Sequence, residues 1–207
     1  MINLSEEKSI FDRGYRYIGG IDEAGRGPLA GPVVSACVVA SRNFIISNKL
    51  HEVKDSKKLT ERKREELFEE IYKSSLEVGI GICNHEIIDK VNILQATFLS
   101  MKKAITMTGI KPEFVLLDGR LPIPNLDIKQ KTFIGGDNLV FLIAAASIIA
   151  KVTRDRLMKE IHNKYPEYGF EQHKGYGTKY HIENLQKYGP CAIHRKTFGP
   201  VKNLLSV

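Results

Sequence analysis

The apolar run from Phe114 to Leu117 ends in a carboxylate, Asp118, and Gly119 follows immediately. Such a short and wholly apolar run is typical of a strand buried in a sheet, which predicts that Asp118 lies at the C-terminal tip of that strand. A carboxylate in that position must reach solvent at the sheet edge or find cations. Functional sites of open α/β sheets gather at these carboxyl ends. Taken alone, Asp118 fits a helix-capping role and a ligand role equally well.

Further strand-like runs alternate with helical patterns along the chain. Strands are expected at residues 15–22, 32–40, 76–83, 113–118 and 127–134. Helices are expected at residues 60–74, 93–107, 137–163 and 178–187. Thr60 is the expected cap of the first helix, and Asp137 or Asn138 is the expected cap of the third. This alternation predicts the α/β fold class.

No internal repeat, low-complexity tract or linker divides the sequence. A chain of 207 residues fits one large domain. We therefore expect residues 1–207 to form a single domain, in which residues 164–207 make a loop-rich C-terminal extension.

Two acids, Asp22 and Glu23, end the first expected strand and stand just before Gly25, Arg26 and Gly27. Backbone amides exposed by such glycines can approach a phosphate or a sugar closely, and the guanidinium can pair with a phosphate. The alternative is a Gly-rich turn with solvated acids. Because successive strand residues point to opposite faces, the two acids can share a site only if the strand ends or bends there.

The candidate acids gain meaning as a set, which consists of Asp22, Glu23, Asp118 and Asp137. They are hard oxygen ligands without an accompanying His or Cys cluster, and such a set suits Mg²⁺ or Mn²⁺ rather than zinc. Two such ions can clamp the attacking and leaving oxygens of a phosphoryl displacement. Asp137 has capping of a helix as its alternative role, although capping does not exclude metal contact.

The charge pattern favours an anionic partner, because the formal net charge is +7. Residues 172–202 carry six Lys and Arg side chains against one acid, Glu183. In residues 170–181, aromatic rings alternate with cations, a composition that suits stacking on a base or sugar and holding a nucleic-acid backbone. The alternatives are a solvated basic face and a surface loop whose tyrosine anchors on the core.

Signals for location point to the cytoplasm. The three cysteines are far apart and form no C-x-x-C pair, which fits a reducing compartment. The N-terminal residues lack the basic start and apolar stretch of a signal peptide. The longest strongly apolar run, Leu139 to Ala150, is shorter than the roughly 20 residues needed to span a bilayer. We expect a cytoplasmic protein without membrane contact.

Seven motifs occur together and in one order along the chain. They are Gly20–Pro28, Asp55–Leu59, Leu117–Gly119, Gly136–Asp137, Ala145–Asp155, His173–Thr178 and His194–Phe198. In these motifs the sequence resembles the ribonuclease HII family over nearly its whole length. The resemblance implies a ribonuclease H-like fold, with helices on both faces of a mixed central sheet and a C-terminal extension that helps hold the substrate. The Gly-Arg-Gly form of the first motif separates the chain from the sister family, ribonuclease HIII.

The same resemblance implies an endoribonuclease that cuts the RNA strand of RNA–DNA hybrids and cuts 5′ of ribonucleotides embedded in duplex DNA. The products would carry 3′-hydroxyl and 5′-phosphate ends. The partners implied are therefore RNA–DNA hybrid and ribonucleotide-containing duplex DNA. No motif for a protein partner stands out, and a monomer is expected because no large exposed apolar face is indicated.

Residue roles follow from the resemblance as well. The acids that would hold two Mn²⁺ or Mg²⁺ ions are Asp22, Glu23, Asp118 and Asp137. The segment Gly25-Arg26-Gly27 would read the ribose 2′-hydroxyl at an RNA-to-DNA junction, and Tyr176 would stack on the deoxyribose beside it. The other expected substrate-binding residues, with the cations as phosphate contacts, are Lys57, Ser147, Lys151, Arg154 and Lys174. Asp155 lies near this set in sequence, but the family pattern makes Asp137 the fourth acid.

Two rival functions remain open at this point. A metal-dependent DNA nuclease or resolvase with four acids on a related fold would cut a duplex that lacks ribose. A non-catalytic nucleic-acid-binding module would keep every activity after Asp118→Asn. The favoured hypothesis requires a ribonucleotide at the cut and predicts that Asp118→Asn binds but does not cleave.

Overall fold

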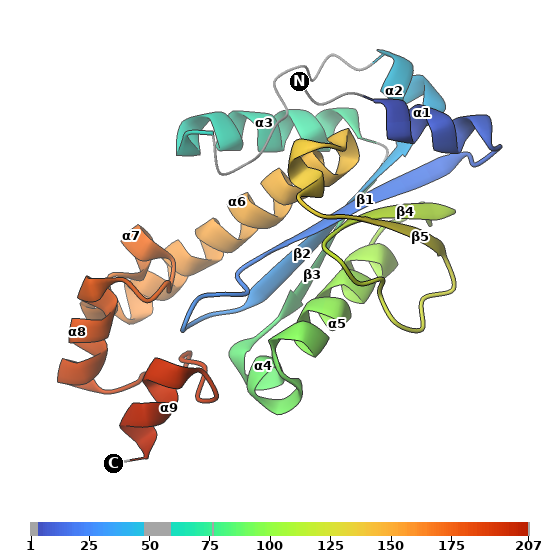
Figure 1. Cartoon of the computed structure of the whole chain (residues 1–207). Coiled ribbons are helices and arrows are strands. Elements are labelled where there is room, and N and C mark those ends of the chain that lie inside the picture. Colours follow the sequence, from blue (N-terminus) through green and yellow to red (C-terminus); the bar gives the residue numbers. More distant parts are fainter. Residues whose placement is uncertain (1–3, 48–58, 76, 207) are drawn as a thin grey trace.

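A mixed five-stranded sheet forms the centre of the computed structural model, which describes residues 4–47, 59–75 and 77–206 (Figure 1). Its strands are β1 Tyr17–Ala24, β2 Val33–Ser41, β3 Glu77–Cys83, β4 Phe114–Asp118 and β5 Lys129–Phe133. They lie in the order β3-β2-β1-β4-β5. The pairs β1–β2 and β2–β3 are antiparallel, whereas β1–β4 and β4–β5 are parallel. The carboxyl ends of β1, β4 and β5 therefore meet at one edge of the sheet.

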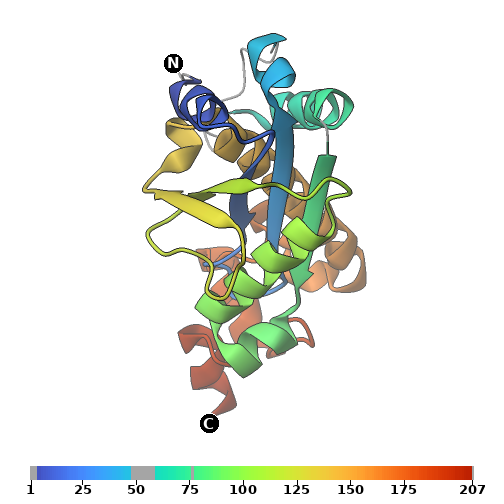
Figure 2. The same cartoon turned by 90° about the vertical axis from the view of Figure 1, so that its right-hand side faces the viewer.

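Helices cover both faces of this sheet, as Figures 1 and 2 show. The long helix α6 (Phe141–Lys164) and α3 (Glu61–Ser74) cover one face, and α5 (Ile93–Thr106) covers the other. Alternate residues of β2 divide between the two layers, because Val38 packs in the α6 core and Val39 in the α5 core. These observations confirm the predicted α/β class and the ribonuclease H-like arrangement of a mixed sheet between helices.

Glycines in the strands let both helices approach the sheet closely. A Cβ atom at Gly20 would lie 2.2 Å from the backbone carbonyl carbon of Leu142 in α6. A Cβ atom at Gly81 would lie 1.9 Å from the carbonyl oxygen of Ser100 in α5. Real Cβ contacts do not reach such distances, so a side chain at Gly81 would push α5 away from the sheet, and one at Gly20 would push α6 away from β1, the strand that carries Asp22 and Glu23.

The predicted strands and long helices are present, with small shifts at their ends. Thr60 caps α3 as expected, since its side chain accepts a hydrogen bond from Lys63 N. The elements that the periodicity did not predict are short, so they carry too few residues for a pattern to emerge. They are α1 Ser5–Asp12, α2 Arg42–Ser47, α4 His85–Val91, α7 Phe170–His173, α9 Gly199–Leu205 and the 3₁₀ turns Gly136–Asn138 and Pro166–Tyr168.

The start of α6 differs from the prediction, because neither Asp137 nor Asn138 caps it. These two residues form a separate 3₁₀ turn, and α6 begins only at Phe141. The capping carboxylate comes from α1: Glu7 Oε1 accepts a hydrogen bond from Leu142 N at 3.0 Å. Glu7 is fully buried, and burial raises its pKa against the opposing effect of the amide donors. Asp137 therefore does not cap α6.

The C-terminal elements pack on the end of α6 and on the loop between β1 and β2 (Figure 1). Their helix α8 (Lys179–Tyr188) starts at Thr178, whose side chain accepts a hydrogen bond from His181 N. A small apolar cluster joins Phe170 and Leu185 of this segment to Leu29 of the loop and Met158 of α6. Among the described residues, no helix is long and apolar enough to cross a membrane.

Candidate active site

Three of the four predicted acids come together where β1 extends beyond the end of its neighbour β4. The last residue pair between these strands is Ile21 with Leu117, so Asp22 and Glu23 extend beyond the paired region while Asp118 ends β4. Although β1 itself continues to Ala24, the open space beyond β4 lets acids from opposite faces reach one cavity. The expectation that β1 had to end or bend at these acids is therefore wrong: β1 stays paired with β2 through Ala24, and it is the pairing with β4 that stops at Ile21.

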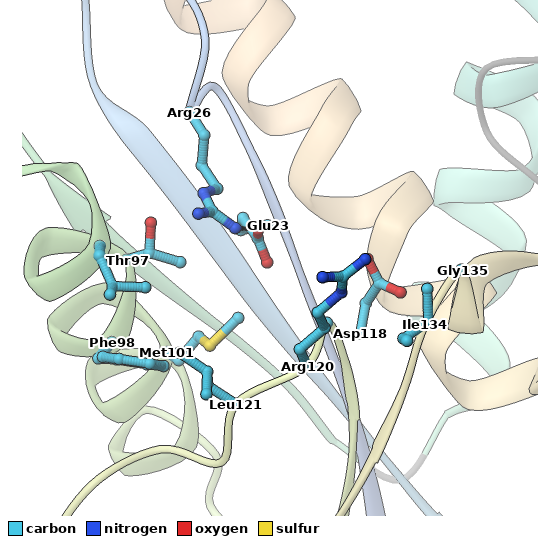
Figure 3. Close-up of a pocket in the computed structure, with 12 residues that line it drawn as sticks. Glu23, Arg26, Thr97, Phe98, Met101, Asp118, Arg120, Leu121, Ile134 and Gly135 are labelled. Atoms are coloured by element: carbon cyan, nitrogen blue, oxygen red, sulfur yellow. Dashed lines mark hydrogen bonds and ion pairs between the residues drawn. The ribbon is translucent and has the colours of Figure 1, made fainter.

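The cavity that contains Asp22, Glu23 and Asp118 has a volume of about 320 Å³. Its other walls are residues 24–27, Ser147 and Lys151 of α6, and Tyr176. A second cavity, of about 570 Å³, opens on the α5 side of Glu23 and Asp118 (Figure 3). Both cavities are lined by Glu23, Arg26 and Asp118, so these three residues lie between two adjoining spaces, whereas Asp22 lines only the smaller one.

The electrostatics of this cluster disfavour three bare carboxylates. Burial, followed by the charges of Glu23 and Asp118, raises the pKa of Asp22 well above its usual value, while a hydrogen bond from Ser147 opposes the rise. Burial also raises the pKa of Glu23 against the nearby Arg26 guanidinium, whose Nη1 lies 3.1 Å from Glu23 Oε1. The other oxygen, Glu23 Oε2, is buried and has no hydrogen-bond donor among the described residues. A cation placed here would relieve both the repulsion and the missing partner.

Asp137 is buried and does not line either cavity. It is connected to the acid cluster through its sequence neighbour Gly136, which contacts Asp118. Its carboxylate accepts a hydrogen bond from its neighbour Asn138 at 3.0 Å. The amide of Gly136 donates to Asp118 Oδ1 at 2.7 Å, which ties the 3₁₀ turn to the end of β4. Across residues 4–47, 59–75 and 77–206, no three acid, His or Cys side chains already converge in a form that could hold an ion.

The loop after β1 depends on a left-handed backbone at Gly25, where φ is +96°. A Cβ atom at this position would lie 2.0 Å from Arg154 Nε and 2.7 Å from Pro32 O. Gly27 is less confined, since its Cβ would make only an ordinary 3.6 Å contact with Tyr176 Cε1. Gly25, Arg26 and Gly27 all line the 320 Å³ cavity beside the acids.

Tyr176 lines the same cavity with its ring 45% exposed. Its backbone is held on both sides, because Tyr176 N donates to His173 O at 2.9 Å and Tyr176 O lies 2.9 Å from His181 Nδ1. His181 is buried and contacts His194 through their Nε2 atoms at 3.1 Å. Burial lowers the pKa of each of these two histidines to about 4, so both are neutral at physiological pH. The buried histidines thus hold the backbone of a half-exposed tyrosine, whose ring has the Arg154 guanidinium 6.0 Å from its centroid.

The predicted phosphate contacts separate into different environments. Lys151 lines the 320 Å³ cavity, and its Nζ pairs with Asp155 Oδ1 at 2.8 Å, which gives Asp155 the role of orienting that lysine. Lys174 is buried, its ammonium donates to the carbonyl of Glu171, and burial lowers its pKa. Lys57 lies outside the described residues.

Arg154 occupies a position that argues against the predicted phosphate contact. It is 1% exposed, and its Nε donates to Pro32 O at 2.9 Å. Its guanidinium is held inside the protein on a backbone carbonyl and lines neither of the two cavities beside the acids. The motif Ala145–Asp155 predicted that Arg154 matters, but the direction of a side chain cannot be read from motif membership.

Arg195 is the functional-site residue that sequence reasoning missed. It is fully buried and donates to carbonyl oxygens of the loop between β1 and β2, including Gly25 O at 2.6 Å and Arg26 O at 2.9 Å. The one available signal was its place in the motif His194–Phe198, which attracted no role because surface cations are common in that segment.

Comparison with known proteins gives consistent similarities. The ribonuclease HII family model matches residues 19–201. The chain is 55% identical over 201 residues to ribonuclease HII of Caldicellulosiruptor bescii, covering 97% of this chain and 94% of that protein. The ribonuclease H2 structure from Pyrococcus horikoshii matches with a TM-score of 0.77 and 28% identity, over 92% of this chain and 97% of that one. Bst-RNase HIII in complex with Mn²⁺ matches with a TM-score of 0.72 over 92% of this chain and 70% of that one, and its 18% identity supports a shared fold alone.

Proposed function

Because the chain belongs to the ribonuclease HII family and is therefore a ribonuclease H, we propose that it cuts 5′ of ribonucleotides embedded in duplex DNA as well as within RNA–DNA hybrids. The proposed reaction is metal-assisted hydrolysis of a phosphodiester, leaving 3′-hydroxyl and 5′-phosphate ends. The rival reading of a non-catalytic binding module is set aside by this family membership.

One observation carries the proposal: a cluster of mutually repelling acids, of which Asp22 is buried and the other two are partly buried, shares a cavity with a glycine loop and an exposed tyrosine. Asp22, Glu23 and Asp118 supply the negative charge, and Gly25 to Gly27 and Tyr176 form the opposite wall. A site built only for DNA cleavage has no need of a wall that closely approaches the sugar. A surface that discriminates RNA from DNA must contact the 2′-hydroxyl, which is the group that distinguishes them.

The acids suit divalent cations for two reasons: their oxygens are suitable ligands, and their negative charges repel one another in the absence of a cation. Carboxylate oxygens are the ligands preferred by Mg²⁺ and Mn²⁺, and the unsatisfied Glu23 Oε2 offers one directly. Asp22, Glu23, Asp118 and Asp137 would hold two ions, with Asp137 supplied from the adjacent 3₁₀ turn. When bound, such ions activate water and stabilise the leaving oxygen. The Mn²⁺ in the related HIII structure is compatible with this choice of metal.

The remaining wall residues would orient the substrate. The loop Gly25-Arg26-Gly27 would receive the ribose 2′-hydroxyl, and Tyr176 would stack on the deoxyribose that follows. Lys151, oriented by Asp155, is the cation best placed to meet a phosphate beside the acids. Ser147 would hold Asp22 in the orientation needed for the ions through their hydrogen bond.

The test is product mapping on a labelled DNA duplex that carries one ribonucleotide, incubated with Mg²⁺, Mn²⁺ or chelator. We expect one cut on the 5′ side of the ribonucleotide, with 3′-hydroxyl and 5′-phosphate ends, and no cut with chelator. An all-DNA duplex of the same sequence is the matched control. Equal cutting of the all-DNA duplex would favour the rival DNA nuclease, and cutting only within long hybrids would contradict the embedded-ribonucleotide activity.

A further inference from the structure

Two buried arginines grip the loop that joins β1 to β2. Arg195, from the C-terminal segment, donates through Nη2 to Gly25 O at 2.6 Å and to Gly31 O at 2.9 Å, and through Nη1 to Arg26 O at 2.9 Å. Its Nε also donates to Gly31 O at 3.0 Å. Arg154, from α6, donates to Pro32 O at 2.9 Å. One guanidinium therefore spans both ends of the loop, and a second supports its return.

This arrangement is unusual for buried cations, because backbone carbonyls take the place of a carboxylate. No ion pair of Arg154 or Arg195 occurs among the described residues, and burial lowers the pKa of Arg195 to about 9 against the opposing effect of the more distant Asp89 charge. Burying a charge without a counter-charge is costly, and an apolar side chain of similar size would fill the space more cheaply. Unlike an apolar side chain, the guanidinium donates several hydrogen bonds and so fixes the orientation of several peptide groups at once.

The orientation of those carbonyls fixes the amides on the other side of the loop. In a trans peptide the C=O of one residue and the N–H of the next point in opposite directions. With Gly25 O and Arg26 O both turned inward to Arg195, the N–H groups of Arg26 and Gly27 are turned away from it. Neither N–H has a hydrogen-bond acceptor in the part of the chain that the structure describes. Both residues line the cavity of the acids, so two unsatisfied donors, directed away from Arg195, belong to the loop that forms its wall.

The C-terminal segment that carries Arg195 is itself fastened to the loop. Arg195 N donates to Leu29 O at 2.8 Å, and Gly31 N donates to Ile193 O at 3.0 Å. An isolated β-bridge joins Ala30 to His194 between these two bonds. The backbone that carries the Arg195 guanidinium is therefore hydrogen-bonded to the same loop that the guanidinium contacts.

From this geometry we propose that Arg195 is the positioning residue that orients the Arg26 and Gly27 amides and so sets the preference for a ribose over a deoxyribose at the cut. The inference rests on the proposed function. Arg195 does not touch the substrate in this account. Its effect passes through the loop, and it selects the sugar rather than supplying chemistry.

The experiment measures dissociation constants by fluorescence anisotropy in the Asp118→Asn background, with Mg²⁺ present. The two ligands are a duplex with one ribonucleotide and the same duplex made wholly of DNA. Arg195→Lys keeps the positive charge but cannot reach Gly25, Arg26 and Gly31 together. It should lower the ratio of the two affinities about tenfold, the loss of one well-aligned hydrogen bond, while affinity for the all-DNA duplex stays nearly constant.

The matched control is Arg156→Lys, because Arg156 lies on the same helix as Arg154 but pairs with Glu65 at the surface. It should leave the ratio unchanged. If Arg195→Lys does not fold, Arg195→Ala is assayed with and without ethylguanidinium, which should restore the ratio by supplying the missing donors. A folded Arg195 variant whose ratio equals that of the parent, or a ratio unaffected by ethylguanidinium, would overturn the inference. A parent protein without any ribose preference would instead overturn the proposed function.

Discussion

Glu7 of α1 caps the start of α6, the helix that carries Ser147 and Lys151 of the site, and substitution of Glu7 tests how much this cap stabilises the fold. Glu7→Ala removes the carboxylate that accepts from Leu142 N at 3.0 Å and leaves that amide buried. Loss of this cap leaves the buried Leu142 amide unsatisfied, which costs about 1–3 kcal/mol. Relief of the buried Glu7 charge, whose second oxygen has no hydrogen-bond donor among the described residues, offsets part of this. We expect the free energy of unfolding to fall by about 2 kcal/mol.

Urea unfolding followed by circular dichroism measures this change directly. Glu7→Gln keeps an acceptor of the same shape and removes the buried charge, so it should stay within about 0.5 kcal/mol of the parent. Glu6→Ala is the neighbouring control, since Glu6 forms only an exposed ion pair with Lys131, of the kind worth about 0–1 kcal/mol. Equal losses from Glu6→Ala and Glu7→Ala would refute the assignment of the cap to Glu7.

Three further predictions concern the walls of the site. Burial lowers the pKa of His181 and His194 from 6.5 to about 4. As the pH falls from 6.5 towards 4, these histidines therefore take up protons in the unfolded chain but not in the folded protein. Stability due to neutral His194 is therefore lost on acidification, and the gap in unfolding free energy between the parent and His194→Gln should shrink by about 1.4 kcal/mol for each pH unit below 6.5, as measured between pH 7 and pH 5. A constant gap would contradict this. Gly25→Ala should lower the unfolding free energy by at least about 1–2 kcal/mol for its left-handed backbone, whereas Gly27→Ala, with an open Cβ position, should cost less, and urea unfolding that ranked them in reverse would be inconsistent with the loop geometry. Tyr176→Ala should weaken binding of the ribonucleotide duplex about tenfold through lost stacking, and Tyr176→Phe should bind like the parent in anisotropy titrations, so equal losses in both would show that the hydroxyl rather than the ring matters.

Sequence reasoning found those parts of the fold that local patterns encode. The apolar run ending at Asp118 predicted a buried strand, and the structure places that carboxylate at the tip of β4. The adjacent acids of the first strand were recognised through their glycine-rich neighbourhood, and they do reach the cavity that contains Asp118. Periodicity and cap residues act over a few positions, so they predict elements and their ends.

Contacts between distant segments were beyond such patterns. The bond between Glu7 and Leu142 spans 135 residues, and nothing local marks Glu7 as a buried acid. The same limit explains Arg154, which was predicted to contact a phosphate but is buried, and Arg195, which was assigned no role although its buried side chain holds the loop between β1 and β2. A cation in a basic segment is indistinguishable in sequence from a surface cation, and only the fold determines which carbonyls surround it.

The most direct test of the central claim is single-turnover cleavage of the ribonucleotide-containing duplex by the parent protein and by Asp118→Asn, with binding measured on the same samples. The account predicts that the variant binds the duplex at least as tightly, because one repelling charge is gone, and that its cleavage rate in saturating Mg²⁺ or Mn²⁺ falls by several orders of magnitude. Retained cleavage by folded Asp118→Asn would contradict the assignment of the acid cluster as the metal-binding catalytic site.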